Sequence, residues 1–303
     1  MISEKDPLRE KRGLYAEHYP TSNERRIELF FPQIENIGGV YLGVGTDQNL
    51  TLAAKARSEF IWLMDFDPEI VKVNECHVFF LKSSKTFSEF KNFWDRKKKA
   101  ETKKFIETSS VPNKERVLAG YLLGIQPGLG VPERLSELNY MHKEFGMSTF
   151  SHSDEDFQFL RKLALENKIQ PVDGDLTGTK SFQNISESTR KANKVIRIFY
   201  TSNAEEYFRF PPNFRKNILS LPIDSKSVIL RTITAGTKHS WGYPDGEKFP
   251  DTFPFHYNFQ RLENLKKWMS LEKDFNIPTL LTFRTSLQKG FSEIQKLPPE
   301  DWK

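Results

Sequence analysis

The fold is decided by the stretch Gly39-Val40-Tyr41-Leu42-Gly43-Val44-Gly45-Thr46-Asp47-Gln48-Asn49. It is a short apolar run that ends in glycines, and from Asn49 to Ala56 the apolar residues recur at helical spacing. The next apolar run, Phe60 to Met64, has the length of a strand and ends in Asp65-Phe66-Asp67-Pro68. Continuous apolar runs of this kind are typical of parallel strands that are buried on both faces. The stretch therefore predicts a strand, a glycine turn, a helix and a second strand.

The same alternation returns later in the chain. Short strands are predicted at Ile169–Val172 and Val195–Tyr200, with a helix from about Phe182 between them. Strands that alternate with helices require crossover connections and form a parallel sheet. The runs 227–233 and 254–259 predict a closing strand pair, which adds an antiparallel edge. The expected fold is a Rossmann-like α/β domain with a mostly parallel sheet, helices on both faces and an antiparallel edge pair.

Three regions are expected along the chain. Residues 1–37 are predicted to form an N-terminal helical cap, residues 38–275 the α/β domain, and residues 276–303 a C-terminal extension. A basic helical insertion is expected at about 84–116, because Phe90, Phe93 and Trp94 follow helical spacing beside Arg96-Lys97-Lys98-Lys99. We expect these aromatic side chains to face inward and the lysines to face solvent.

The composition excludes some classes of protein. The chain has 303 residues, 26 of them Phe, which argues against general disorder. Its net charge of +5 is mild, so it carries no strong nucleic-acid signal. Cys76 is the single cysteine, which excludes an intrachain disulfide, and its apolar neighbours predict burial. The charged N-terminus and the lack of a long apolar run favour a soluble, cytoplasmic protein without a transmembrane segment. The oligomeric state stays open.

The glycine turn and the next strand tip form the first candidate site. Gly43 and Gly45 let the backbone turn sharply and approach a ligand. Asp65 lies 22 residues beyond Gly43, at the strand tip where an acidic residue usually binds the hydroxyl pair of a ribose. The alternative, a tight strand–helix joint without a ligand, stays open.

Three further polar residues are candidates for the site, two after predicted strands and one within a predicted strand. Asp175 is a candidate acceptor for an adenine amino group, and Asn203 is a candidate that faces the substrate. His256 is a candidate general base on a late strand, whereas the six histidines together lack the spacing of metal ligands. The alternatives are an Asp-Gly turn with a helix cap at Asp175, a helix cap at Asn203 and a structural histidine at position 256.

The segments Gly39 to Asn49, Asp65, and Thr201-Ser202-Asn203-Ala204-Glu205-Glu206-Tyr207 together resemble an uncharacterised bacterial family. Its members carry a Gly-Val-Gly-x-x-Gln-Asn turn and a Ser-Asn-x-Glu-x-Tyr segment, and they look like class I S-adenosylmethionine-dependent methyltransferases. The resemblance implies that Gly43, Gly45, Asp65 and Asp175 bind the cofactor, and that Asn203 lines the methyl-transfer site. The pattern departs from that of working methyltransferases at Tyr41 and Asp47, where an acidic residue and a glycine are usual.

These observations favour an S-adenosylmethionine-dependent methyltransferase that acts on a small or lipid-like acceptor. The alternative is a non-catalytic ligand-binding or scaffold protein on the same fold, which Tyr41 and Asp47 favour. A nicotinamide oxidoreductase is disfavoured, because Gln48 stands where the third glycine of Gly-x-Gly-x-x-Gly belongs.

Overall fold

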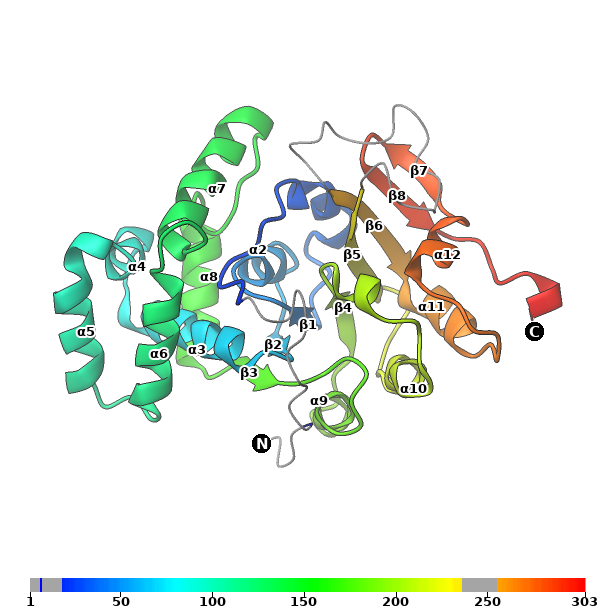
Figure 1. The fold of residues 1–303 in the computed structure, drawn as a ribbon, viewed down its shortest axis with the longest axis horizontal. Helices are drawn as coiled ribbons and strands as arrows, with labels where there is room; N and C mark the ends of the chain where they lie inside the picture. Colours follow the sequence, from blue (N-terminus) through cyan, green and yellow to red (C-terminus); the bar gives the residue numbers. More distant parts are fainter. Residues whose placement is uncertain (1–5, 7–17, 236–254, 303) are drawn as a thin grey trace.

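The computed structural model describes residue 6 and residues 18–235 and 255–302. Strands of these residues form one sheet in the order β3-β2-β1-β4-β5-β6-β8-β7 (Figure 1). The parallel part consists of β1 (Val40–Val44), β2 (Phe60–Asp65), β3 (Ile169–Asp173), β4 (Ile196–Tyr200) and β5 (Val228–Thr234). The Rossmann-like fold predicted from the sequence is therefore confirmed, since this strand order reverses between β1 and β4 as in doubly wound sheets.

The other edge of the sheet is antiparallel. Strand β6 (Phe255–Arg261) pairs antiparallel with β5, and β8 (Phe291–Ile294) lies parallel to β6. Strand β7 (Thr285–Gln288) completes the edge, antiparallel to β8. The predicted closing pair is present as β5 and β6, and its Gly/Pro-rich connection lies outside the described residues. Two further strands extend the sheet beyond it.

Side chains of the central strands alternate between two cores. On β1, Tyr41 packs into one apolar cluster and Leu42 into the other, and their partners in register on β2, Ile61 and Trp62, divide in the same way. Both faces of these strands are therefore apolar, which is the physical reason why the sequence shows continuous apolar runs there.

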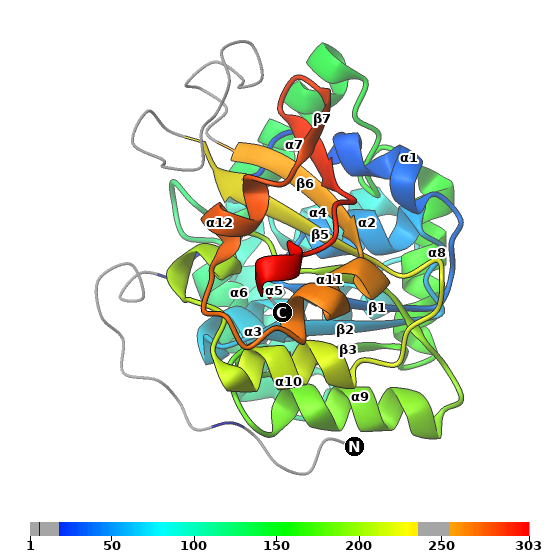
Figure 2. The ribbon, with the colours of Figure 1, turned by 90° about the vertical axis from the view of Figure 1, so that its right-hand side faces the viewer.

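Helices cover both faces. The first face carries α1 (Phe31–Ile34), α2 (Gln48–Lys55), α3 (Pro68–Ser83) and α8 (Asp154–Leu165). The second face carries α9 (Ser181–Lys191), α10 (Pro212–Ser220), α11 (Leu262–Met269) and α12 (Ile277–Leu281), and Figure 2 shows α9, α10 and α11 from their outer side. Short 3₁₀ turns are η2 (Ile27–Phe30), η4 (Ala204–Tyr207) and η5 (Glu300–Trp302). Within the described ranges, no helix has both the length and the apolar character needed to cross a membrane.

The basic segment belongs to a larger helical insertion between β2 and β3. It comprises α4 (Phe87–Phe93), η3 (Arg96–Lys98), α5 (Lys99–Thr108), α6 (Lys114–Gly124) and α7 (Val131–Phe145), on the left in Figure 1. Phe90 and Trp94 are fully buried, as expected, whereas Lys97 and Lys99 are exposed. The insertion thus extends well beyond the expected range of 84–116, because α7 also packs against the sheet core through Leu138 and Met141.

Both predicted terminal regions differ in the structure. Within the predicted cap of residues 1–37, the described part begins as an irregular strap, residues 18–26, and becomes helical at η2 and α1. Residues 276–303 are no separate extension, because Phe291 and Ile294 of β8 are buried in the two cores and β8 pairs with β6. Residues 1–5 and 7–17 lie outside the described part.

Candidate functional site

A cavity of about 430 Å³ opens at the carboxyl ends of the parallel strands. This is the edge where open α/β sheets bind ligands, next to the reversal of strand order between β1 and β4. The walls come from the glycine turn, the tips of β2 and β3, the strap and the segment after β4. The lining residues used below are Tyr19, Ser22, Asn23, Gly45, Gln48, Asp65, Asp67, Asp175, Ser202, Asn203, Phe208 and Phe255.

The two glycines of the turn have different environments. Gly45 lines the cavity and has a φ of +95°, a conformation that favours glycine. Gly43 is not among the lining residues, and a Cβ there would lie 2.0 Å from Oδ1 of Asn49 and 2.5 Å from a ring carbon of Tyr41. Gly43 therefore serves the close packing of β1 against α2, and Gly45 is the glycine that faces the cavity.

Asp65 points toward the glycine turn and lines the same cavity as Gly45. Its Oδ1 accepts a hydrogen bond from the backbone amide of Asp67 at 2.9 Å. Full burial raises the pKa of Asp65 to about 7, the Asp67 carboxylate adds to this increase, and the backbone amides of Asp67 and Gly45 oppose it. Near neutral pH, both the protonated and the ionised form of Asp65 are thus populated.

Asp67 and Asp175 also line the cavity, and each has a structural role as well. Asp67 caps α3 by accepting from the amide of Glu69 at 2.9 Å, and its Oδ2 lies 2.6 Å from Nδ1 of His18 in the strap. Asp175 accepts from both the amide and the hydroxyl of Thr177, which makes a local turn. The helix cap expected as the alternative is absent, because α9 begins at Ser181 with Lys180 as its N-cap. Both carboxylates still border the cavity, so a structural and a binding role are compatible.

Asn203 lines the cavity after the end of β4. Its side-chain amide donates a hydrogen bond of 3.4 Å to the hydroxyl of Tyr207 and also bonds to the carboxylate of Glu206, which leaves its carbonyl oxygen for a ligand. The preceding residue, Ser202, has a φ of +51° and donates to Oε1 of Glu24 at 2.6 Å. The hydrogen bond holds the backbone in a conformation that residues other than glycine rarely adopt.

Glu24 is a buried carboxylate that joins the strap to the sheet. It accepts hydrogen bonds from four hydroxyls: Ser22 in the strap, Tyr200 in β4, Ser202 in the turn that follows β4, and Thr232 in β5. A buried charge that is saturated by four hydroxyl donors is well compensated. The strap is thereby held across the carboxyl edge of the sheet.

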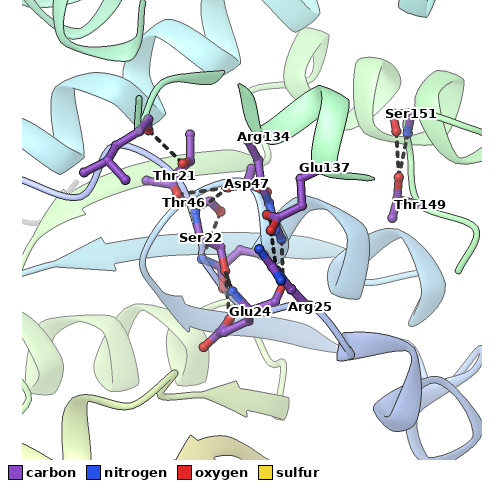
Figure 3. Close-up of polar contacts among 12 residues, drawn as sticks. Thr21, Ser22, Glu24, Arg25, Thr46, Asp47, Arg134, Glu137, Thr149 and Ser151 are labelled. Carbon is purple, nitrogen blue, oxygen red and sulfur yellow. Dashed lines mark hydrogen bonds and ion pairs between the residues drawn. The ribbon is translucent and has the colours of Figure 1, made fainter. Parts of the chain in front are cut away.

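Asp47, which stands where methyltransferases usually have a glycine, connects the turn to the insertion (Figure 3). Its Oδ2 accepts from Nε of Arg134 on α7 at 2.9 Å, and its Oδ1 accepts from the amide of Ser22 at 2.8 Å. Arg134 also donates to the backbone carbonyl of Glu24 and to Glu137. The departure at Asp47 is thus explained by a buried ion pair between the glycine turn and α7.

The second departure, Tyr41, is explained by packing. Its hydroxyl donates to Oδ1 of Asn49 at 2.8 Å, and its side chain lies in the core below α2 rather than among the residues that line the cavity.

His256 lies apart from Asn203. It is buried on β6, which does lie beside β5 as expected, and its Nε2 is 2.7 Å from Oγ of Ser292 on β8. Burial and the charge of Arg284 lower the pKa of His256 to about 3. The neighbouring Phe255 lines the cavity, but His256 does not, because alternate residues of a strand point to opposite faces. The expectation that His256 and Asn203 meet over one pocket is therefore not met.

Sequence reasoning missed the strap and Gln48. Gln48 is 3% exposed and lines the cavity, and its Oε1 accepts no hydrogen bond within the described part of the chain. A signal for the strap was present in the sequence, because Thr-Ser-Asn occurs at residues 21–23 and again at 201–203. Both tripeptides border the cavity.

Comparisons with known proteins add the following. No curated protein matches the chain. Among solved structures, an rRNA methyltransferase, aviRa from Streptomyces viridochromogenes, is similar over 72% of this chain and 72% of its own, with 12% sequence identity and a TM-score of 0.31. Similarity at this level carries no information about a substrate. Residues 19–295 match a family described as a domain of unknown function, DUF7790, and because the match spans most of the chain, the protein belongs to this family.

Proposed function

We propose that the protein is an S-adenosylmethionine-dependent methyltransferase whose cofactor binds in the cavity at the carboxyl edge of the sheet. The observation that carries the proposal is the set of polar groups offered there. The charged side chains among the described lining residues are three carboxylates, those of Asp65, Asp67 and Asp175. These carboxylates suit the hydroxyls, the amino groups and the positive sulfonium of this cofactor.

Individual residues support the fit. Asp65 lies at the β2 tip, where an acidic side chain accepts hydrogen bonds from ribose hydroxyls. The buried Oε1 of Gln48 lacks a donor within the described part of the chain and borders the same space, so a ligand donor would satisfy it. Gly45 lets the backbone approach the ligand closely. When bound, the cofactor would supply an electrophilic methyl group.

The chain's own contribution is alignment. The cofactor would supply the methyl group, and the residues of the cavity would hold an acceptor atom in line with it, because positioning of this kind lowers the barrier to transfer. Asn203 and the strap residues Ser22 and Asn23 border the cavity and would orient the acceptor and exclude water. The proposal gives no catalytic role to His256.

The carboxylate of Asp47 argues against a dinucleotide as the ligand. Dinucleotide-binding folds place the pyrophosphate at the N-terminus of the first helix, where backbone amides and the helix dipole attract an anion. Here, the N-terminus of α2 is preceded by Asp47, whose carboxylate is buried and paired with Arg134. A second anion at this place would lie against the Asp47 carboxylate.

A non-catalytic ligand-binding protein is the second candidate, and the Tyr41 position favours it. The acidic residue that usually holds the amino group of the cofactor's methionine part is replaced by a tyrosine bound to Asn49, away from the cavity. Such a protein would bind the ligand in the same cavity without turnover.

Calorimetric titration of the full chain with S-adenosylhomocysteine, S-adenosylmethionine and NAD tests the proposal. We expect the two sulfur ligands to bind and NAD not to bind. Asp65→Asn should weaken S-adenosylhomocysteine binding by about 10-fold or more, because a hydrogen bond to a charged group contributes about 1.5–3 kcal/mol. The matched control is Asp224→Asn, which removes a carboxylate paired with Arg197 outside the cavity.

Tighter binding of NAD than of S-adenosylhomocysteine, or equal binding by the Asp65→Asn variant and the wild type, would contradict the proposal. Binding of S-adenosylmethionine without methyl transfer to any acceptor in a broad screen would favour the non-catalytic candidate.

A further inference from the structure

The repeated tripeptide Thr-Ser-Asn, at residues 21–23 and 201–203, forms two turns that meet at one carboxylate. Ser22 donates to Oε2 of Glu24 at 3.0 Å, and Ser202 donates to Oε1 of Glu24 at 2.6 Å. The next residue in each turn, Asn23 or Asn203, lines the cavity. Two primary amides that lie 180 positions apart in the sequence are therefore presented to the same space.

These two amides have unused hydrogen-bonding capacity. Asn23 is exposed and forms no side-chain hydrogen bond within the described part of the chain. The amide of Asn203 donates to the hydroxyl of Tyr207 at 3.4 Å and bonds to the carboxylate of Glu206, so its carbonyl oxygen is the atom left for a ligand. A primary amide has two N–H donors and one carbonyl acceptor. The donors of Asn23 and the two carbonyls together match a ligand edge that carries both donors and acceptors.

The backbone that presents the amides is preorganised. Glu24 is buried and holds both turns, the amide of Ser22 is bound to Asp47, and the carbonyl of Ser202 accepts from the amide of Thr232 at 3.0 Å. The backbone strain at Ser202, with its φ of +51°, is retained through these contacts. Glu24 is in this sense a positioning residue, since it acts on a ligand only through the two serines.

Aromatic side chains also line the cavity. Phe208 and Phe255 are among them, and the charged lining residues lie at the ends of β2 and β3. Flat apolar walls with a few polar groups suit a planar ring, and the absence of a lining lysine or arginine among the described residues disfavours a phosphate or carboxylate at this place.

We infer that Asn23 and Asn203 form a binding site for a neutral planar nitrogen heterocycle with an amide-type edge, the chemical class of the nucleobases. The inference deepens the proposed function, on which it rests, by assigning this class to the methyl acceptor. The ligand is either a free nucleoside or a base within a single strand, and both present the same edge.

Ligand-observed NMR titrations of the full chain test the site. Cytosine serves as the probe, and phenol as a ring of similar size without an amide-type edge, each with and without saturating S-adenosylhomocysteine. We expect cytosine to bind more tightly than phenol in both conditions. The double variant Asn23→Ala/Asn203→Ala should weaken cytosine binding at least 10-fold and change S-adenosylhomocysteine affinity less than 3-fold.

The matched control is Asn92→Ala, which removes an exposed amide of α4 that does not line the cavity. It should leave cytosine affinity unchanged. Equal binding of cytosine and phenol, or cytosine binding that survives the double substitution, would overturn the inference.

The amide site and the proposed cofactor site can be refuted separately. Cytosine binding without S-adenosylhomocysteine binding would keep the amide site and refute the proposed function, whereas the reverse would refute the amide site alone. Cytidine and hexacytidylate form the last pair of probes. Tighter binding of cytidine identifies a free nucleoside, tighter binding of hexacytidylate identifies a base within a strand, and both results support the site.

Discussion

Asp65 is a carboxyl group whose burial changes its chemistry. Its pKa of about 7 in the folded protein compares with 3.8 for an unperturbed aspartate. The folded state therefore holds the proton to a higher pH than the unfolded chain does. By linkage, the contribution of Asp65 to the free energy of unfolding falls as the pH rises from about 4 to about 7, and it stays constant above that.

Asp65→Asn removes this loss and should raise the Tm at pH 8 by at least about 2 °C, with a smaller increase at pH 5. Scanning calorimetry at the two pH values measures it. Asp224→Asn is the control, and it should lower the Tm instead of raising it. The hydrogen bond from Arg197 and contacts with the 226–227 turn lower the pKa of Asp224 despite its partial burial, so its ionised form stabilises the fold. An equal Tm change at both pH values for Asp65→Asn would contradict the linkage.

The ionisation of Asp65 also bears on binding. If ribose hydroxyls donate to its carboxylate, S-adenosylhomocysteine affinity should rise between pH 6 and pH 8 in the wild type and stay flat in Asp65→Asn. Calorimetric titrations across this range separate the two variants. A flat profile in the wild type would mean that Asp65 does not accept from the ligand.

Helix α7 is joined to the glycine turn through the Arg134–Asp47 pair. Both side chains are buried, and Arg134 spans from the insertion to the turn and the strap. Arg134→Met keeps an unbranched apolar stem but leaves the Asp47 charge without its partner, which we expect to lower the free energy of unfolding by about 3–5 kcal/mol.

Urea denaturation measures this effect. The control, Lys191→Met, removes an exposed partner of Glu187 on α9 and should leave the free energy of unfolding nearly unchanged, because solvent screens such a pair. Similar losses for the two variants would show that the buried pair does not hold α7 in place.

The basic segment from Arg96 to Lys104 contains one arginine that is bonded to the fold and three lysines that are not. Arg96 binds Glu133 and the carbonyls of Ile125 and Gln126, whereas no hydrogen bond or ion pair engages the side chains of Lys97, Lys98 and Lys99 within the described residues. Replacing these three lysines with Gln should change the free energy of unfolding by no more than about 0.5 kcal/mol each.

Phe90→Ala, in the same segment, provides the contrast. Phe90 is fully buried, and its loss should cost about 3–5 kcal/mol. A large loss of Tm in the triple lysine variant would contradict the assignment of these side chains to a solvated face.

The insertion and the sheet share one core on the first face of the sheet. The cluster contains Tyr41 and Ile61 from the sheet together with Trp94, Tyr121 and Leu138 from the insertion. The insertion therefore has no separate apolar core on that face, and we expect it to unfold together with the sheet in a single calorimetric transition. The calorimetric and van't Hoff enthalpies should agree. Two resolved transitions would contradict this expectation.

Local patterns in the sequence determined the parallel part of the fold. The apolar runs of β1 and β2 and the helical spacing of α2 act over a few residues, and each is present where it was predicted. The strand-tip rule likewise brought Gly45, Asp65, Asp175 and Asn203 to one cavity. In contrast, β7 was missed because its residues are exposed, and β8 because it is short and pairs with a strand more than 30 residues earlier in the chain.

What only the tertiary structure decided is the second wall of the cavity. The bond from Ser202 to Glu24 joins residues 178 positions apart, and the bond from Arg134 to Asp47 joins residues 87 positions apart. A hydrogen bond between such distant residues requires no spacing or periodicity in the sequence, so no local pattern announces it. The sequence by itself therefore determined which strand tips meet, and the folded chain decided that the strap and α7 close the site around them, because burial leaves Glu24 and Asp47 no partners other than those that folding brings to them.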